Sequence, residues 1–311
     1  MSLLSTYRCA VTNQRENGRA NWRGLAFVAL GVSMIMLDTT IVNVSLPWMA
    51  FDLGFTTSDT QWVVAAYSLT FASLLILAGR LADLFGRRRL FVIGTSLFVA
   101  ASMLIGVSNS VGMVIAGRAL QGMGGAIIMP TSLALINASF SGRNRTTAFA
   151  VWGGTIGGMA ALGPLVGGWL TTYATWHWAF FVNLPICLIV IFGARATMPE
   201  SRDEEAGSGF DVPGVVLSTL GFAGIVFALI EGSHYGWISQ LREFSIGSLT
   251  WTTGHMSIAL LAAIEGSLCL IAFVVVERQR AASGKPLLLD LRLFAIRSFR
   301  MGNIVAVIVS L

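Results

Sequence analysis

The stretch Gly79-Arg-Leu-Ala-Asp-Leu-Phe-Gly-Arg-Arg-Arg-Leu-Phe91 is strongly basic and lies between two apolar runs, residues 62–78 and 90–108. Each run approaches the ~20 residues that a helix needs to span a bilayer. We therefore predict a tight loop at a membrane face, turned at Gly79 and Gly86, because glycine permits a sharp change of backbone direction. Arginines in short loops are retained on the cytoplasmic side, so this face is predicted to be the inner one.

The composition indicates the same class of protein. Of the 311 residues, 55% are hydrophobic and 11% are charged, an apolar fraction that no soluble domain could bury. The net charge of +5 is explained by loop arginines on one membrane face, so no nucleic-acid partner is expected. The 3 cysteines give neither a disulfide framework nor a metal-ligand spacing, and we expect no metal and no cofactor.

The apolar segments predict an all-α membrane protein with about eight full transmembrane helices and the start of a ninth. The helices are predicted at residues 24–47, 61–79, 90–108, 111–136, 146–170, 178–194, 213–230 and 256–276, with the ninth beginning near residue 301. The 11 residues from 301 to 311 are too few to span a bilayer, so we expect the chain to stop inside a helix. With the N-terminus inside, 18 of the 20 basic residues fall in inner segments, which predicts a cytoplasmic N-terminus.

The basic stretch also carries a specific spacing. It reads Gly79-x-x-x-Asp83-x-x-Gly86-Arg87-Arg88. An ordinary basic loop between two helices would explain the arginines but not the whole pattern. The pattern resembles the signature of the major facilitator superfamily between its second and third helices. The resemblance implies a helical transport bundle of that type. Asp83 is the one acid among the four arginines of the stretch, so we expect it to form a salt bridge.

Arg118 is the one basic residue inside a predicted helix, and Gln121 lies one turn further on the same face. The string Arg118-Ala-Leu-Gln121-Gly resembles the helix 4 motif of the same superfamily. A charged group within hydrocarbon is costly and marks a functional site by default. We therefore expect Arg118 to act in transport, with Gln121 as a candidate substrate contact.

Asp38 lies deep in the first predicted helix, where a carboxylate is again a site hypothesis. At ~1.5 Å per residue, Asp38 and Arg118 reach the same depth in the membrane to within a turn. We predict that the two residues pair, that they couple transport to protons, and that Asp38 also binds substrate. Asn43, five residues on, is expected near the same face as either a substrate contact or a packing group.

The fifth predicted helix is rich in glycines spaced four residues apart, which permit close helix packing. Pro164 removes a backbone donor and is expected to kink the helix. The string Gly163-Pro164-x-x-Gly167-Gly168 resembles a motif of the exporting antiporters of the superfamily. It implies that the direction of transport is outward.

The stretch from Trp176 to Pro185 resembles the entry to helix 6 of the fourteen-helix drug–proton antiporters, which commonly have Arg at the position of His177. Residues 210–214, 231–232 and 286–294 resemble other segments of that family. His177 is expected to be an ordinary surface residue, a titratable group being the alternative. Glu265, midway along the eighth helix, is expected to face a neighbouring helix, with a proton or drug contact as the alternative.

The resemblance also implies a division of the chain. The predicted parts are a cytoplasmic tail at 1–23, a six-helix transport bundle at 24–198, a cytoplasmic linker at 199–212, two extra transmembrane helices at 213–276, and a connector with the start of a second bundle at 277–311. The rest of the second bundle would be a missing partner.

These features predict a secondary active transporter of the plasma membrane. We expect it to export lipophilic drugs or toxic compounds, cationic ones in particular, in exchange for protons. A metabolite importer or facilitator on the same fold, and a non-transporting membrane bundle, are the alternatives. Enzyme activity is not expected, because the sequence contains no phosphate-binding glycine loop with lysine and no metal-ligand cluster.

Overall fold

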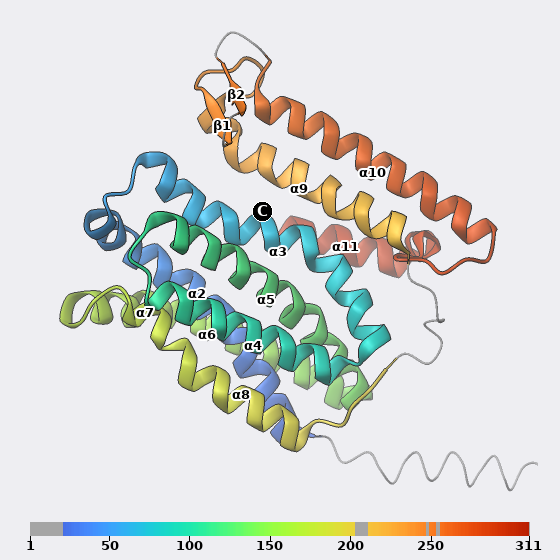
Figure 1. The fold of residues 1–311 in the computed structure, drawn as a ribbon. Helices are drawn as coiled ribbons and strands as arrows, with labels where there is room; N and C mark the ends of the chain where they lie inside the picture. The colour runs from blue at the N-terminus through green and yellow to red at the C-terminus, as the bar shows by residue number, and fades with distance from the viewer. Residues whose placement is uncertain (1–20, 203–210, 247–248, 253–255, 311) are drawn as a thin grey trace, which may run out of the picture. The chain divides into compact units, whose positions relative to one another are not determined.

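The computed structural model describes residues 21–202, 211–246, 249–252 and 256–310, and most of them are helical (Figure 1). Within this part of the chain, eight helical spans are long and apolar enough to cross a membrane. This confirms the predicted fold class. Most of the predicted tail, residues 1–20, and residues 203–210 of the predicted linker lie outside the described residues.

The helices from α2 to α8 follow one another with short connections, and longer segments precede and follow α9. In chain order they are α2 (Trp22–Leu53), α3 (Thr57–Phe85), α4 (Arg87–Gly106), α5 (Val111–Ser139), α6 (Gly142–Tyr173), α7 (Trp178–Phe181), α8 (Asn183–Thr197), α9 (Val212–Tyr235), α10 (Ile258–Ala282), the 3-10 helix η1 (Leu291–Ala295) and α11 (Arg297–Ser310). Helices α7 and α8 together form one span.

The chain divides into two compact units. One comprises Met1–Tyr67 and Leu81–Arg202, and the other comprises Ser68–Arg80 and Asp203–Leu311. The first unit therefore holds α2 and α4 to α8, and the second holds α9 to α11 with the middle of α3. The domain limits predicted from the sequence stay a prediction, and each unit is described by itself.

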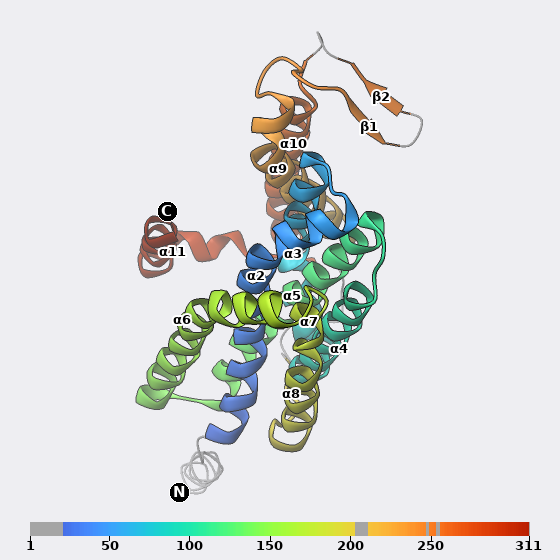
Figure 2. The same ribbon diagram turned by 90° about the vertical axis from the view of Figure 1, so that its left-hand side faces the viewer.

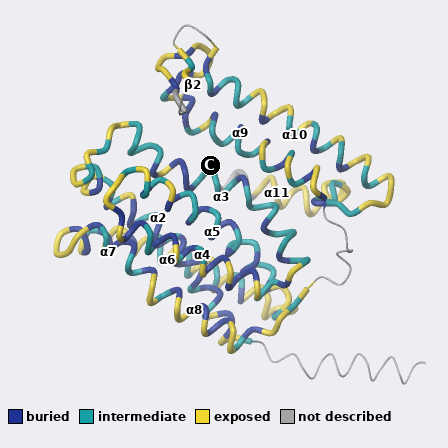
Figure 3. Tube along the Cα trace, viewed as in Figure 1, coloured by how far each residue is buried: buried dark blue, intermediate teal, exposed yellow. Residues whose placement is uncertain are grey.

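In the first unit, α4 packs along α5, α2 packs along α6, and α8 lies against α2 and α4. Small residues make the closest crossing possible. A Cβ atom on Gly124 of α5 would lie 2.9 Å from the carbonyl oxygen of Gly94 on α4, so the two helix backbones touch where glycines meet. The buried positions of α2, α4 and α5 form the core of this unit (Figure 3).

In the second unit, α9 packs along α10 through glycines of the same kind, since a Cβ on Gly266 would lie 2.7 Å from the backbone nitrogen of Ile225. Between the two helices the chain forms an antiparallel hairpin, β1 (Phe244–Ile246) and β2 (Leu249–Trp251), which the sequence analysis does not predict. Asp211 caps α9 by accepting a hydrogen bond from the backbone of Gly214 at 3.0 Å.

The predicted loop at residues 79–91 is wrong in its extent. Helix α3 continues to Phe85 and α4 begins at Arg87, so Gly86 alone separates them. Gly86 has φ +107°, a conformation that L side chains rarely adopt, whereas Gly79 lies within α3 and makes no turn. The run after Gly79 contains good helix formers and no breaker, so the helix continues beyond the apolar segment.

Other helices are also longer than their apolar cores. Helix α2 runs through Pro47 to Leu53, and α3 begins at Thr57 because Thr56 and Asp59 form a capping box. Helix α11 begins at Arg297, four residues before the predicted ninth helix. Hydropathy marks the part of a helix that suits hydrocarbon, while caps and breakers decide where the helix ends.

Candidate functional site

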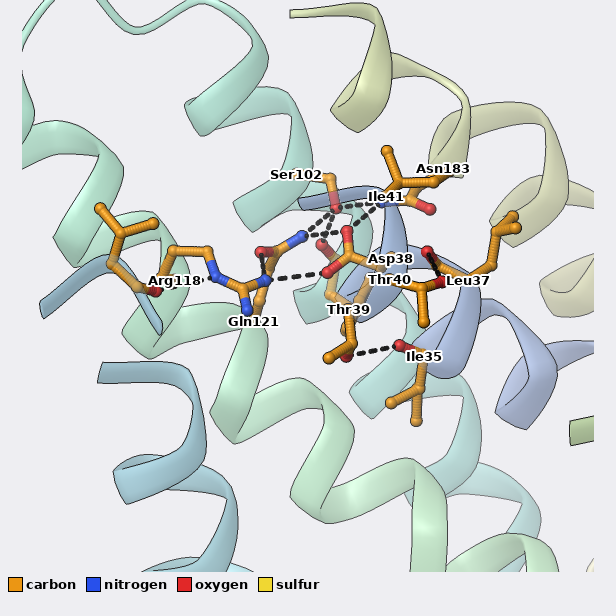
Figure 4. A network of polar contacts seen from close by, with 12 residues as sticks. Ile35, Leu37, Asp38, Thr39, Thr40, Ile41, Ser102, Arg118, Gln121 and Asn183 are labelled. Atoms are coloured by element: carbon orange, nitrogen blue, oxygen red, sulfur yellow. Dashed lines mark hydrogen bonds and ion pairs between the residues drawn. The ribbon is translucent and has the colours of Figure 1, made fainter. Parts of the chain in front are cut away.

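The centre of the first unit holds a buried ion pair between α2 and α5. Asp38 is fully buried on α2, and the side chain of Arg118 on α5 is 2% exposed. Nη1 of Arg118 donates a hydrogen bond of 2.8 Å to Oδ2 of Asp38 (Figure 4). Asp38 and Arg118 were predicted to pair because they reach the same depth in the membrane, and the structure brings them together. Their roles in transport stay a prediction.

Three uncharged side chains complete the network. Gln121 donates through Nε2 to Oδ1 of Asp38 at 3.0 Å and to Oγ of Ser102 at 2.8 Å, and its Oε1 accepts from Arg118 at 2.8 Å. Asn183, the first residue of α8, donates through Nδ2 to Oδ1 of Asp38 at 2.7 Å and to Ser102 at 3.2 Å. Helices α2, α4, α5 and α8 therefore contribute to one buried polar cluster, whose side chains point towards one another (Figure 4).

Sequence reasoning missed Ser102 and Asn183. Asn183 gave a signal, because it is a lone amide in the apolar run 179–186. Ser102 gave none, since serine in a transmembrane helix usually bonds its own helix, and Ser102 does so at 2.9 Å to the carbonyl of Phe98. Its second role as an acceptor appears only when α4 is seen against α5 and α8.

The Arg118 side chain has further partners on α3. Its Nε donates to the backbone carbonyl of Val63 at 3.2 Å. Its guanidinium carbon lies 4.4 Å from the centroid of the Tyr67 ring, a cation–π contact. These contacts to α3 hold the guanidinium group in place independently of its ion pair with Asp38.

In the described part of the chain, each side chain that forms a hydrogen bond with the Asp38 carboxylate is a donor. The donors are Arg118, Gln121 and Asn183, an arrangement suited to a negative charge. Oδ1 of Asn183 is buried and has no hydrogen-bond partner in the described structure. The site can therefore hold an ionised carboxylate at a depth where an unpaired charge would be very costly.

Asn43 does not join this network. Asp38 is fully buried, whereas Asn43 is exposed on α2. Five residues correspond to about 140° around a helix, so the two side chains point to different sides of α2. The expectation that they share a face is wrong, and the role of Asn43 as a substrate contact stays a prediction.

The glycine motif of α6 packs against α2 close to Asp38. A Cβ on Gly167 would lie 3.2 Å from Cα of Ile41, and one on Gly163 would overlap Thr40. Gly163 and Gly167 therefore have the close-packing role expected of them. Pro164 is exposed and Gly168 meets open space, and α6 changes direction along its length (Figure 2).

A Cβ atom on the α6 glycines at positions 153, 154, 157 and 158 would meet no atom of a neighbouring element within 4 Å in the described structure, so the close packing expected of them is not found. An apolar groove of about 460 Å³ is lined by residues of both α2 and α6, among them Leu30, Ser33, Thr155, Met159 and Leu162. Its lining is almost entirely apolar, so the groove suits a lipophilic group.

An ion pair connects the residues on the two sides of the Gly86 turn. Arg87 donates to Oδ1 of Asp83 through Nη2 at 3.0 Å and through Nε at 3.2 Å. The pair bridges the end of α3 and the start of α4. It gives the predicted salt bridge of Asp83 a specific partner.

Glu200, which follows α8, caps the start of α4. Its carboxylate accepts hydrogen bonds from the backbone nitrogens of Arg88 at 3.0 Å and Arg89 at 3.1 Å. A Cβ on Gly86 would lie 2.7 Å from Oε1 of Glu200, so glycine is needed there for this approach as well as for its backbone angles. Sequence reasoning did not identify Glu200 as part of the signature.

Two residues of open role lie elsewhere. The His177 ring stacks on Trp176 with centroids 3.7 Å apart, and His177 is half-buried. Glu265 is exposed on α10 in the second unit and accepts a hydrogen bond from Cys269 at 3.2 Å. Among the described residues, no group of three or more His, Cys, Asp or Glu side chains could hold a metal ion.

Comparison with known proteins identifies the family. The Major Facilitator Superfamily model matches residues 28–295. The chain is 39% identical to the puromycin resistance protein pur8 of Streptomyces alboniger over 83% of this chain and 48% of that protein. It is 36% identical to the tetracenomycin C resistance and export protein of Streptomyces glaucescens over 78% of this chain and 43% of that protein.

The crystal structure of the POT family transporter PepTSo is similar in fold, with a TM-score of 0.57 at 15% identity over 85% of this chain and 55% of that chain. The chain spans about half the length of the curated relatives it matches. The match to the family model covers most of the chain, from α2 to η1. The chain therefore belongs to the major facilitator superfamily.

Proposed function

We propose that this chain forms the first bundle and two further helices of a proton-coupled exporter of lipophilic cationic compounds, in the plasma membrane with its N-terminus inside. The observation that carries the proposal is the ion pair of Asp38 and Arg118, buried among four helices. The names of its relatives support export, because one is a resistance protein and another a resistance and export protein.

The network suggests how a proton and a cation would compete. With Asp38 ionised, the pair is neutral and its donors are satisfied. A proton on Asp38 removes the counter-charge of Arg118, which keeps its contacts to Val63 and Tyr67. A half-turn of the Asn183 amide would then bring its unpartnered Oδ1 towards the new O–H donor.

A cationic substrate that reaches Asp38 needs the ionised carboxylate, so the proton must leave before the substrate binds. In this mechanism the proton and the substrate compete for one carboxylate, and this competition couples the movement of the proton to the movement of the substrate. Tyr67 and Cys187 are also titratable side chains near Asp38. We assign the exchange to Asp38 itself, because its carboxylate accepts the hydrogen bonds of Arg118, Gln121 and Asn183.

Transport by this mechanism requires a second bundle. Transporters of this superfamily alternate by rocking one half of the molecule against the other around a midplane site. Because the relatives are about twice as long, we propose that the second half completes the path. The small-molecule substrate, protons, the lipid bilayer and this second bundle are thus the proposed partners.

The experiment measures uptake of a lipophilic cationic dye into inside-out vesicles that contain the chain together with the second half of a relative. We expect uptake that depends on the proton gradient, that Asp38→Asn abolishes and that Asp52→Asn preserves. Asp52 is the matched control, because it lies exposed on the same helix and accepts a hydrogen bond from Trp176 at 2.9 Å.

Equal, gradient-driven uptake by Asp38→Asn would contradict the assignment. Uptake that does not respond to the gradient would favour a facilitator. The absence of transport by every variant, with normal insertion, would favour a non-transporting bundle.

A further inference from the structure

A basic pocket lies where α4 begins and α8 ends, on the first unit. It has a volume of about 590 Å³ and is lined by Arg88, Arg89, Val92, Ile93, Arg195 and Glu200. We call it the arginine pocket. None of the groups assigned to the proposed transport reaction lines it.

The charges of the pocket do not balance. Glu200 is its one acid, and the carboxylate is already engaged by the first backbone nitrogens of α4. Arg88 lies 3.7 Å from Glu200 and donates to the carbonyl of Met198 at 3.0 Å. Arg89 and Arg195 are exposed and have no ion pair in the described part of the chain. Three cations against one acid leave an excess of two positive charges.

The position of the pocket fits the interface of a bilayer. Arg89 lies in the first turn of α4 and Arg195 in the last turn of α8, and both helices belong to membrane spans. Of the lining residues, Ile93 is 46% exposed, and Phe192, three residues before Arg195 on α8, is an apolar side chain that is 65% exposed. The surface is thus cationic at headgroup level and apolar where acyl chains would lie.

We propose that the arginine pocket binds an anionic phospholipid, with its phosphate between Arg89 and Arg195 and its acyl chains along Ile93 and Phe192. Guanidinium groups match phosphate oxygens in planar, bidentate hydrogen bonds. The apolar wall selects a lipid over a free phosphate, because a soluble anion would leave that wall unused. Glu200 stays on the α4 N-terminus and does not bind the lipid.

The test compares binding of phosphatidylglycerol and phosphatidylcholine to the purified 311-residue protein by native mass spectrometry at increasing lipid concentration. The wild type is expected to prefer phosphatidylglycerol. At about 1 kcal/mol for each basic residue near an anionic headgroup, a single Arg89→Gln or Arg195→Gln change lowers its affinity roughly 5-fold, and the double change roughly 30-fold. Affinity for phosphatidylcholine should stay within about 2-fold.

The matched control is the double change Arg143→Gln and Arg145→Gln, two exposed arginines at the start of α6, which should leave the preference intact. Circular dichroism confirms that each variant is folded. Loss of the preference in the control as well would show a general charge effect and overturn the site. Retention of the preference in the Arg89/Arg195 variant would overturn it too. Displacement of the lipid by an equal concentration of glycerol phosphate would show a soluble-anion site instead.

Discussion

Removing one charge of the buried pair should destabilise the first unit more than any other single change to the network. Asp38 and Arg118 are 2.8 Å apart, with side chains 0% and 2% exposed. At an effective dielectric constant of about 20, unit charges at that distance attract by about 6 kcal/mol, and desolvation offsets much of this gain. Leaving one partner unpaired typically costs about 3–5 kcal/mol.

The two single variants should differ. Asp38→Asn leaves a buried guanidinium, which cannot lose its charge, so we expect a loss of about 3–5 kcal/mol in the free energy of unfolding. Arg118→Met leaves a carboxylate that can take up a proton, so its loss should be smaller and should decrease as the pH is lowered. The double variant has no unpaired charge, so its loss should be smaller than the sum of the two by about 3 kcal/mol.

Cys187 offers a probe that reports on this unit alone. It is fully buried on α8, and its Sγ lies 3.0 Å from Sδ of Met34 on α2. With Cys9 and Cys269 changed to Ser, pulse labelling of Cys187 by a maleimide along a denaturant series gives the free energy of opening. A loss below about 1 kcal/mol for Asp38→Asn, or strict additivity in the double variant, would refute the reasoning.

Three further results are expected. Asn183→Leu removes a 2.7 Å hydrogen bond to a buried charge and should reduce the free energy of opening at Cys187 by about 1.5–3 kcal/mol. The control Asn137→Leu, at an exposed site of α5, should change it by less than about 0.5 kcal/mol. Equal effects of the two changes would contradict the role of Asn183. Gly167→Leu should lose about 1–3 kcal/mol by overpacking, while Gly157→Leu, which meets open space, should not, and tolerance of both changes would show that α6 is not closely packed. Ser239→Cys, exposed between α9 and α10, should react with an impermeant maleimide in intact cells if the N-terminus is inside, and labelling only after lysis would indicate the opposite topology.

The spans and the ion pair could be predicted because they depend on one-dimensional quantities. The length of an apolar run reports whether a helix can cross hydrocarbon. The depths of Asp38 and Arg118 follow from counting along two helices of opposite direction. Position around the helix is different, because it depends on which neighbours pack there. This is why Asn43 was placed on the wrong side and Ser102 was missed.

The signature stretch shows a second limit. Its glycines, acid and arginines were identified, but the helix-to-helix junction at Gly86 was predicted as a longer loop. Hydropathy falls where the chain leaves the membrane, while the helix continues to Phe85. The partner that explains Gly86, Glu200, lies 114 residues further along the chain. A single sequence gives no signal for a contact of that range.

Proton release on substrate binding tests the central claim most directly. Purified protein, comprising this chain and the second bundle, is placed in weakly buffered solution with a pH indicator, and a lipophilic cation is added. The proposed competition at Asp38 predicts proton release by the wild type and by Asp52→Asn, and none by Asp38→Asn. Undiminished proton release from Asp38→Asn, at the wild-type substrate affinity, would contradict the assignment of Asp38 as the coupling carboxylate.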